Sequence, residues 1–242
     1  MRLNGQKPNP QKMMKKIVFL AIMAMLMASG SCVMNSSTAN RPTEVPQANQ
    51  TTTMSPFDEV DLAGAMNVVL EQGTTYAVRV ESPATAFEHV VIYVADHTLH
   101  IGNKRLQSGS AMTDSVTVYV TTPSLSEIEL SGAGNITATQ PLKVTDMHIE
   151  LAGAGNIDIT TLTCTNLDAE LAGSGNINVG TLQARDVDTE ISGSGNVTYK
   201  NINAVRARSE ISGSGNITLS GHIDDHRSEI SGSGEIDTMG LK

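Results

Sequence analysis

A carboxylate returns at a regular interval through the C-terminal half of the sequence. Each copy precedes an apolar residue and a glycine-containing string, and successive copies lie 19 to 21 residues apart: Glu129, Glu150, Glu170, Glu190, Glu210 and Glu229. Such side chains come together if each interval forms one coil of a solenoid, because stacked strands lie about 4.8 Å apart. The spacing therefore predicts a column of outward carboxylates, whose chemistry would be binding of a cation or a basic ligand.

Neighbouring residues decide where this column stays acidic. Asp168 and Asp188 add negative charge two residues before the third and fourth glutamates. Arg208 and Arg227 occupy the same position before the last two glutamates and can reduce the repulsion between them. Adjacent carboxylates at this spacing repel by about 0.9 kcal/mol even in bulk water. We predict an acidic ligand or cation surface in the middle coils, and the alternative is a solvated face that keeps the solenoid soluble. The candidate residues are Glu150, Asp168, Glu170, Asp188 and Glu190.

The Gly-x-Gly string beside each carboxylate resembles phosphate-binding loops only superficially. A phosphate loop occurs once and opens a helix, whereas this string recurs in every copy and precedes a strand. Calcium-binding nonapeptide repeats need an Asp after the glycines and a nine-residue period, but here an Asn follows on a period of about 20. We expect the stacked amides to hydrogen-bond to one another or to cap the corner.

The remaining residues give no support to catalysis, a cofactor or a resident metal. No Ser, His and acid set stands out from the repeated serines. The six histidines share no ligand spacing, and His97 and His100 are expected to flank a hairpin turn. A net charge of −9 excludes nucleic acid as the main partner, because binding phosphates needs a basic face. We predict that the protein is not an enzyme.

The repeat itself specifies a solenoid of short strands. Within one copy Leu167, Ala169 and Leu171 alternate with polar residues, which is the period of a strand. One copy cannot bury its own apolar face, but stacked copies form a continuous core. The stack predicts one apolar column of Leu130, Leu151, Leu171, Ile191, Ile211 and Ile230 and another of Ile136, Ile157, Ile177, Val197, Ile217 and Ile236.

The predicted fold is an all-β, right-handed parallel β-helix with coils of about 20 residues. A leucine-rich repeat has a similar period, but its L-x-x-L-x-L spacing is missing. We expect the glycine pairs to form the corners, because glycine tolerates positive φ. These structural-turn residues are Gly132, Gly134, Gly153, Gly155, Gly173, Gly175, Gly193, Gly195, Gly213 and Gly215.

The segment before the repeats differs from them. Residues 57–127 contain several short strand patterns and a degenerate repeat copy that begins at Asp61. We expect this N-terminal β region to form wider first coils or a cap, because a β-helix otherwise ends in unpaired backbone groups. The repeat β-helix then occupies residues 128–242.

The N-terminus has the features of an export signal. Lys12, Lys15 and Lys16 precede an apolar run of about 11 residues, too short to span a bilayer as a helix, and small residues follow. We predict a signal peptide over residues 1–31, with translation starting at Met1, Met13 or Met14. Residues 32–56 are rich in Asn, Ser, Thr, Gln and Pro, which predicts a flexible tether.

Cys32 follows the small residues at the end of the apolar run and resembles the lipidated cysteine of bacterial lipoproteins. The match departs from that pattern at Ser29, where an aliphatic residue is usual. The resemblance implies lipid attachment at Cys32 and membrane association through this lipid. The alternative is an ordinary secretory signal. Cys164 lies within the repeats and is expected to be a small buried hydrophobe rather than a disulfide partner.

The repeated G-[AS]-G-N-[IV] motif, the V-D-L-A-G-A-M-N-V string and the T-T-P-S-L-S-E-I-E-L lead-in resemble the putative auto-transporter adhesin, head GIN domain family. The resemblance covers residues 57–242. It implies an exported or lipid-anchored protein of a Gram-negative cell envelope with a β-helical fold, here an outer-membrane lipoprotein facing the periplasm or the surface. It offers no catalytic residues.

The function predicted from the sequence is a β-helical binding module of the adhesin type, which offers stacked polar side chains to a glycan or protein. One alternative is an envelope structural or assembly protein that docks, or forms homo-oligomers, through the solenoid end near Gly240 and Leu241. Another is a carbohydrate-active enzyme, which would need a non-repeated cluster of acids and bases in a groove.

Overall fold

The structure, a computed structural model, describes residues 49–104 and 115–242. The described residues all belong to one compact unit. The predicted signal peptide, Cys32 and most of the predicted tether lie outside the described residues. Within the described part of the chain, no helix has the length and apolar composition needed to cross a bilayer.

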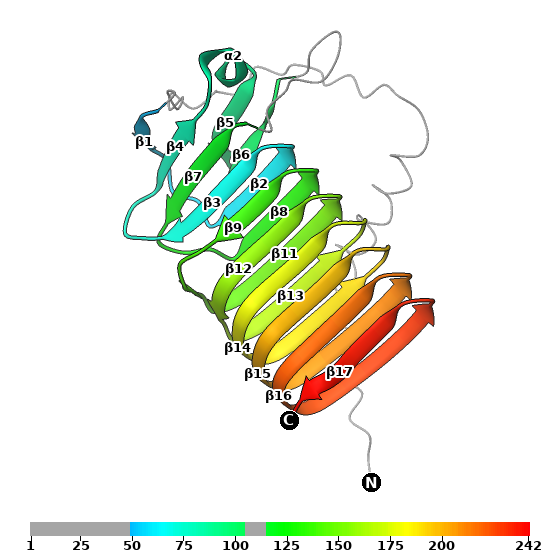
Figure 1. Cartoon of the computed structure of the whole chain (residues 1–242). Coiled ribbons are helices and arrows are strands. Elements are labelled where there is room, and N and C mark those ends of the chain that lie inside the picture. Colours follow the sequence, from blue (N-terminus) through cyan, green and yellow to red (C-terminus); the bar gives the residue numbers. More distant parts are fainter. Residues whose placement is uncertain (1–48, 105–114) are drawn as a thin grey trace. The chain divides into compact units, whose positions relative to one another are not determined.

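The compact unit is a β-helix whose strands stack into two long walls and a short third side (Figure 1). The first wall consists, in stacking order, of β6 (Thr98–Asn103), β2 (Glu59–Gly64), β8 (Glu127–Gly132), β11 (Asp146–Gly153), β13 (Asn166–Leu171) and the C-terminal parts of β14 (Asn176–Ile191), β15 (Asn196–Gly213) and β16 (Asn216–Gly232).

The second wall consists of β7 (Thr117–Thr122), β3 (Asn67–Gln72), β9 (Asn135–Ala138), β12 (Asn156–Thr163), the N-terminal parts of β14, β15 and β16, and β17 (Glu235–Leu241). The third side begins with β10 (Leu142–Lys143), which pairs with the end of β12. All of these pairings are parallel, so each coil lies on the one before it.

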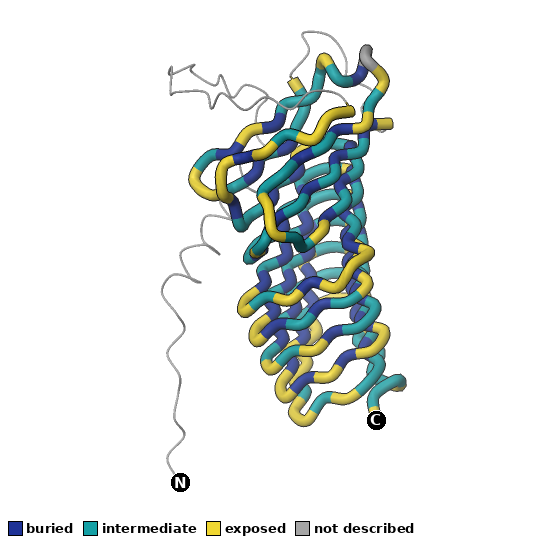
Figure 2. Tube along the Cα trace, turned by 90° about the vertical axis from the view of Figure 1, so that its left-hand side faces the viewer, coloured by how far each residue is buried: buried dark blue, intermediate teal, exposed yellow. Residues whose placement is uncertain are grey.

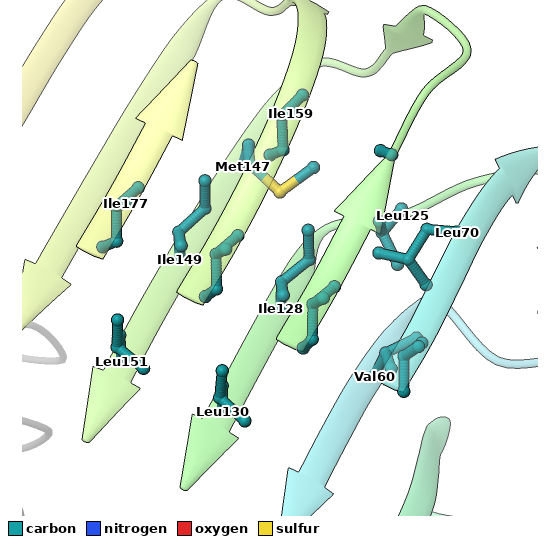
Figure 3. Packing of buried hydrophobic residues seen from close by; sticks show 14 of the residues in the cluster. Val60, Leu70, Leu125, Ile128, Leu130, Met147, Ile149, Leu151, Ile159 and Ile177 are labelled. Atoms are coloured by element: carbon teal, nitrogen blue, oxygen red, sulfur yellow. The ribbon is translucent and has the colours of Figure 1, made fainter. Parts of the chain in front are cut away.

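The register confirms the two predicted apolar columns. In the first wall Leu151 pairs with Leu171, which pairs with Ile191, and in the second wall Ile157 pairs with Ile177. These residues are at most 1% exposed. Buried positions alternate with less buried ones along most strands of the two walls (Figure 2), and the inward aliphatic side chains of successive coils lie one above another (Figure 3). The strand period of two therefore builds a continuous aliphatic core.

The N-terminal region forms both a coil and a cap. The degenerate repeat copy supplies β2 and β3, which lie against β8 and β9 with Asp61 opposite Glu129. The later strands β6 and β7 stack on the other side of this coil, so the spatial order differs from the chain order. The outer edges of β6 and β7 are covered by antiparallel strands, β5 (Val90–Ala95) and β4 (Ala77–Glu81), which are joined through α2 (Ala84–Phe87).

The ordered fold begins before residue 57. The short strand β1 (Thr51–Thr53) pairs antiparallel with β4, and the Met54 side chain that follows it is buried. This strand lies in the segment that the composition assigns to the tether. The sequence pattern does not reveal this strand, because its three threonines show no apolar periodicity and it pairs with β4 through the backbone at the edge of the cap.

All ten predicted corner glycines contact the backbone of the neighbouring coil, but a positive φ occurs at only one of them. Gly132 has a positive φ of 141°, whereas none of the other nine glycines has a positive φ. At all ten positions a Cβ atom would lie 2.1–2.4 Å from a backbone carbonyl oxygen of the preceding coil. Glycine is therefore required because successive corners stack in backbone contact, not because each corner needs a left-handed conformation.

Candidate functional site

Seven carboxylates form a continuous outward column on the first wall, which we call the acidic column. Strand pairing places Glu129 beside both Asp61 and Glu150, and each later member beside the next. Three of the five predicted ligand-surface residues, Glu150, Glu170 and Glu190, lie in its middle. The acidic column consists of Asp61, Glu129, Glu150, Glu170, Glu190, Glu210 and Glu229.

A second column lies two residues away on the same strands and changes sign along its length. The predicted Asp168 and Asp188 are paired within it. Its members, from the cap to the last coil, are Glu59, Glu127, His148, Asp168, Asp188, Arg208 and Arg227. The structure thus brings all five predicted residues onto one face of neighbouring coils, which we call the acidic face.

Basic groups limit the acidic face towards the last coils. Arg208 forms an ion pair with Glu210 and lies 3.6 Å from the Asp188 carboxylate. It therefore reduces the repulsion between carboxylates of the column, as expected. Arg227 instead contacts Asp225 of its own strand, at 3.4 Å, rather than the expected Glu229. The middle coils therefore hold the greater density of acidic side chains.

Two histidines belong to this face, although no histidine pattern was recognised in the sequence. His148 Nε2 lies 3.9 Å from Glu150, and its Nδ1 lies 4.0 Å from Asp168 in the next coil. His100 does not flank the hairpin turn, which contains His97, but lies in β6 with Nδ1 2.9 Å from Asp61. The sequence did contain a signal that places His148 on this face. His148 lies two residues before the column residue Glu150, which is the position that Asp168 and Asp188 occupy in later coils.

The second wall presents a neutral face built on a ladder of asparagines. Each side-chain amide donates from Nδ2 to Oδ1 of the asparagine one coil earlier, over 2.8–3.0 Å, which confirms the expected bonding between stacked amides. The ladder runs through Asn67, Asn135, Asn156, Asn176, Asn196 and Asn216. Because the amides satisfy one another, the ladder stabilises the corner and leaves fewer polar groups for a ligand.

An open groove of about 460 Å³ runs along the last coils of this neutral face. Its lining is mostly amide and hydroxyl, and it ends at two carboxylates: Asn176, Asn178, Asn196, Thr198, Asn216, Thr218, Glu235 and Asp237. No group of three or more His, Cys, Asp or Glu side chains within the described ranges is arranged to hold a metal ion. Cys164 is buried, as expected, and burial raises the pKa of its thiol to about 11.

The family described as "Putative auto-transporter adhesin, head GIN domain" matches residues 56–181 and 179–242. The chain belongs to this family. The match covers almost all of the β-helix, including the cap, and confirms the resemblance drawn from the repeated glycine and asparagine strings. No curated protein matches the sequence.

Solved structures share the fold of this head GIN domain. A putative adhesin from Bacteroides fragilis has a TM-score of 0.62 and 22% identity, over 80% of this chain and 99% of its own. A putative adhesin from Parabacteroides merdae has a TM-score of 0.63 and 20% identity, over 80% and 98%. A putative lipid binding protein from Parabacteroides distasonis has a TM-score of 0.58 and 23% identity, over 78% and 94%.

Glu129, in the acidic column of this head GIN domain, has a strongly raised pKa. Its pKa is raised to about 7, mainly by partial burial and also by the neighbouring charges of Asp61, Glu150 and Glu127, while His148 acts in the opposite direction. Burial lowers the pKa of His148, but its contact with the Glu150 carboxylate and the charges of Asp168, Glu127 and Glu170 outweigh this effect, so the net shift is upward. The folded protein therefore binds protons here more tightly than the unfolded chain does.

This proton affinity predicts that the solenoid is more stable at pH 5 than at pH 8. A raised folded-state pKa adds stability as the pH falls from above 7 towards the ordinary carboxyl pKa of 4.5. Since solvent screens a partly exposed group, we expect the Glu129 contribution to be about 1–2 kcal/mol rather than the full value of the shift. Glu129→Gln should stabilise the protein at pH 8 and reduce the difference between the two pH values, as measured by urea unfolding.

Glu71→Gln is the matched control for this experiment, because Glu71 is an exposed glutamate of β3 on the second wall. It should leave the pH dependence close to that of the wild type. His148 also makes the protein more stable at the lower pH. The informative quantity is therefore the change in unfolding free energy between pH 5 and pH 8, compared between wild type and Glu129→Gln. An unchanged pH dependence in Glu129→Gln would show that Glu129 is ionised normally in the folded protein.

Proposed function

We propose that this head GIN domain is an exported, lipid-anchored binding module of the adhesin type that acts at the cell envelope. The observation that carries the proposal is the acidic face, where carboxylates from successive coils are held in register on a rigid parallel sheet. The family description and the names of the structural neighbours support binding as the class of function. The export signal and Cys32 support the location.

The acidic face favours a ligand that carries positive charge. Its carboxylates repeat at the coil spacing of about 4.8 Å, so a basic protein segment or an amino-sugar glycan lying along the solenoid axis would meet a charge in every coil. Each contact is weak, since exposed ion pairs contribute about 1 kcal/mol or less. Affinity would therefore come from the number of coils engaged, and the backbone stacking keeps those coils in register without an ordering cost at binding.

Anchoring and binding can be separated in whole cells that express the full chain. Cys32→Ser should move the protein from the membrane to the soluble fraction and abolish capture of cells on surfaces coated with polylysine or chitosan oligosaccharide. The triple variant Glu150→Gln, Glu170→Gln and Glu190→Gln should stay in the membrane fraction but lose at least about tenfold in capture.

The control for charge on the opposite face is Asp158→Asn, which neutralises a carboxylate of the second wall. It should capture cells like the wild type. Equal capture by the triple variant and the wild type would remove the acidic face as the contact surface. An unaltered membrane fraction for Cys32→Ser would remove the lipid anchor and leave the binding proposal standing.

One observation favours the second candidate function, assembly through the solenoid end. Met239 in β17 is 90% exposed, and Ile230 in the last coil is 46% exposed. The third candidate, cleavage of a polysaccharide, gains no comparable support, because the groove of the second wall is lined mainly by repeated amides and hydroxyls.

A further inference from the structure

The two ends of the solenoid are built differently. At the N-terminal end, antiparallel strands β5 and β4 cover the outer edges of β6 and β7, and β1 in turn covers β4. At the other end, the last segment of the first wall pairs only with β15, and β17 pairs only with β16. Within residues 49–104 and 115–242, these two edges have no further strand beside them, so they present unpaired backbone groups.

The open end also exposes side chains of the core columns. Ile230 is 46% exposed, whereas its counterparts Ile211 and Ile191 in the two preceding coils are 2% and 0% exposed. An accessible strand edge with an adjoining apolar residue is the feature to which another strand adds.

We propose that a second copy of this chain covers the open end, with residues 225–231 of the two copies paired antiparallel about a two-fold axis at Ser228. Directly opposed residues in an antiparallel pair lie on the same face of the sheet. Ile230 then lies opposite His226 of the second copy on the core side. On the outer face, Arg227 lies opposite Glu229 of the second copy, and Glu229 lies opposite its Arg227.

Charge selects this arrangement over a continued parallel stack. Inside the chain, parallel stacking places Arg227 beside Arg208 and Glu229 beside Glu210, so each charge lies next to its like. A further parallel coil would repeat this repulsion, whereas reversing the strand direction opposes unlike charges. The interface is isologous, as expected for a two-fold dimer, and it closes after two copies.

Other antiparallel registers are less favourable. A two-fold axis at Arg227 would oppose two arginines, and an axis at Glu229 would oppose two glutamates. An axis at His226 would pair only residues 225–227, because the chain turns at Asp224 from the third side into the first wall. The Ser228 register is the one that pairs the wall segment from Asp225 to Ser231 and also opposes unlike charges.

Charge exchange tests this dimer. The protein to use is the fragment from residue 42 onward, because it forms one compact unit and contains the whole core. Sedimentation equilibrium should show wild-type dimers at about 100 µM or below. Arg227→Glu and Glu229→Arg should each weaken dimerisation at least about tenfold, since each opposes like charges twice. The double variant R227E/E229R should recover the dimer, and a mixture of the two single variants should form a heterodimer.

Lys200→Glu is the control for net charge, because it makes the same charge change at an exposed residue of the preceding coil. It should dimerise like the wild type. Circular dichroism of each variant verifies folding, and folding should survive in Arg227→Glu because the new carboxylate would lie beside Arg208. A monomeric wild type, or single variants that do not combine on mixing, would overturn the proposal.

The register has its own test by cysteine cross-linking. Self-opposed residues of an antiparallel pair have Cα atoms about 4.5–5.5 Å apart, which is within the range that a disulfide bridges. Ser228→Cys should therefore form a disulfide between copies on mild oxidation. Ser231→Cys should not, because Ser231 is opposed by Asp225 rather than by itself. Efficient cross-linking of Ser231→Cys but not of Ser228→Cys would contradict the register even if a dimer forms.

Discussion

Replacing Gly175 with alanine is expected to destabilise the solenoid by at least about 3 kcal/mol, in spite of the small change in volume. A Cβ atom at this position would lie 2.1 Å from the carbonyl oxygen of Gly155 and 2.9 Å from Cδ2 of Leu151. The carbonyl oxygen of Gly155 belongs to the backbone and accepts a hydrogen bond from the backbone N–H of Asn176, with 3.1 Å between the nitrogen and the oxygen. The clash can therefore be relieved only by separating two coils, which breaks bonds of this kind along the corner.

Ser174→Ala is the matched control, because Ser174 lies between the two corner glycines with its side chain exposed. Two other coils already have alanine there, at Ala133 and Ala154. Its effect should stay within about 0.5 kcal/mol. Urea unfolding followed by circular dichroism measures both variants. If Gly175→Ala were as stable as Ser174→Ala, the coils would have room for a methyl group at the corner, and close approach could not explain the glycines.

Truncating Tyr199 to alanine is expected to cost about 3–5 kcal/mol, the range for removing a large buried aromatic side chain. Tyr199 is fully buried, and it occupies the position where the preceding coil has the smaller Val179. Its hydroxyl lies 3.0 Å from the hydroxyl of Thr189, which is 1% exposed on the first wall. A small polar residue across the core therefore makes space for the ring and satisfies the phenol.

Two further variants separate packing from hydrogen bonding. Tyr199→Phe keeps the ring but leaves the buried Thr189 hydroxyl without this partner, so it should cost only about 1–2 kcal/mol. Tyr93→Ala removes a tyrosine that is 40% exposed and stacked on His100, and it should cost less than about 1 kcal/mol. Thermal and urea unfolding rank the three. A cost for Tyr199→Ala no larger than that for Tyr93→Ala would show that the ring is not a core element.

Burial also raises the pKa of the Tyr199 phenol. The folded protein should therefore keep this phenol neutral at a pH where exposed tyrosines ionise, and its ionisation should accompany alkaline unfolding. Ultraviolet absorbance of Tyr199→Phe against wild type isolates this group and gives a second readout of its burial.

The repeat made much of the β-helix predictable. Residues such as Leu151 and Leu171 meet because each coil contacts mainly the coils next to it, so a constant period fixes the register. The acidic column and the asparagine ladder follow from the same period. The repeat also drew attention to the corner glycines, but the close contact that requires them could not be predicted, because a sequence does not show how closely two stacked backbones approach.

The cap could not be predicted in the same way. Its strands interrupt the repeat and pair out of chain order, with β6 and β7 lying outside the earlier coil of β2 and β3. No periodicity marks these parallel pairings, because β4, α2 and β5 lie between the two coils in the sequence and interrupt the repeat. The degenerate repeat copy that begins at Asp61 was a signal in the sequence for the extension of the acidic column, but the contact of Asp61 with His100 became apparent only from the fold.

The sequence by itself determined the coil period, the residues that face the core and the ones that line the acidic face, because each depends on contacts that repeat from coil to coil. Tertiary structure alone decided the properties of single positions within those columns. The raised pKa of Glu129 reflects its partial burial and a charge contributed by Asp61, 68 residues earlier in the chain. Ile230 is exposed because, within the described residues, its strand segment pairs on one side only. Both depend on where the stack begins and ends, which an identical repeat does not specify.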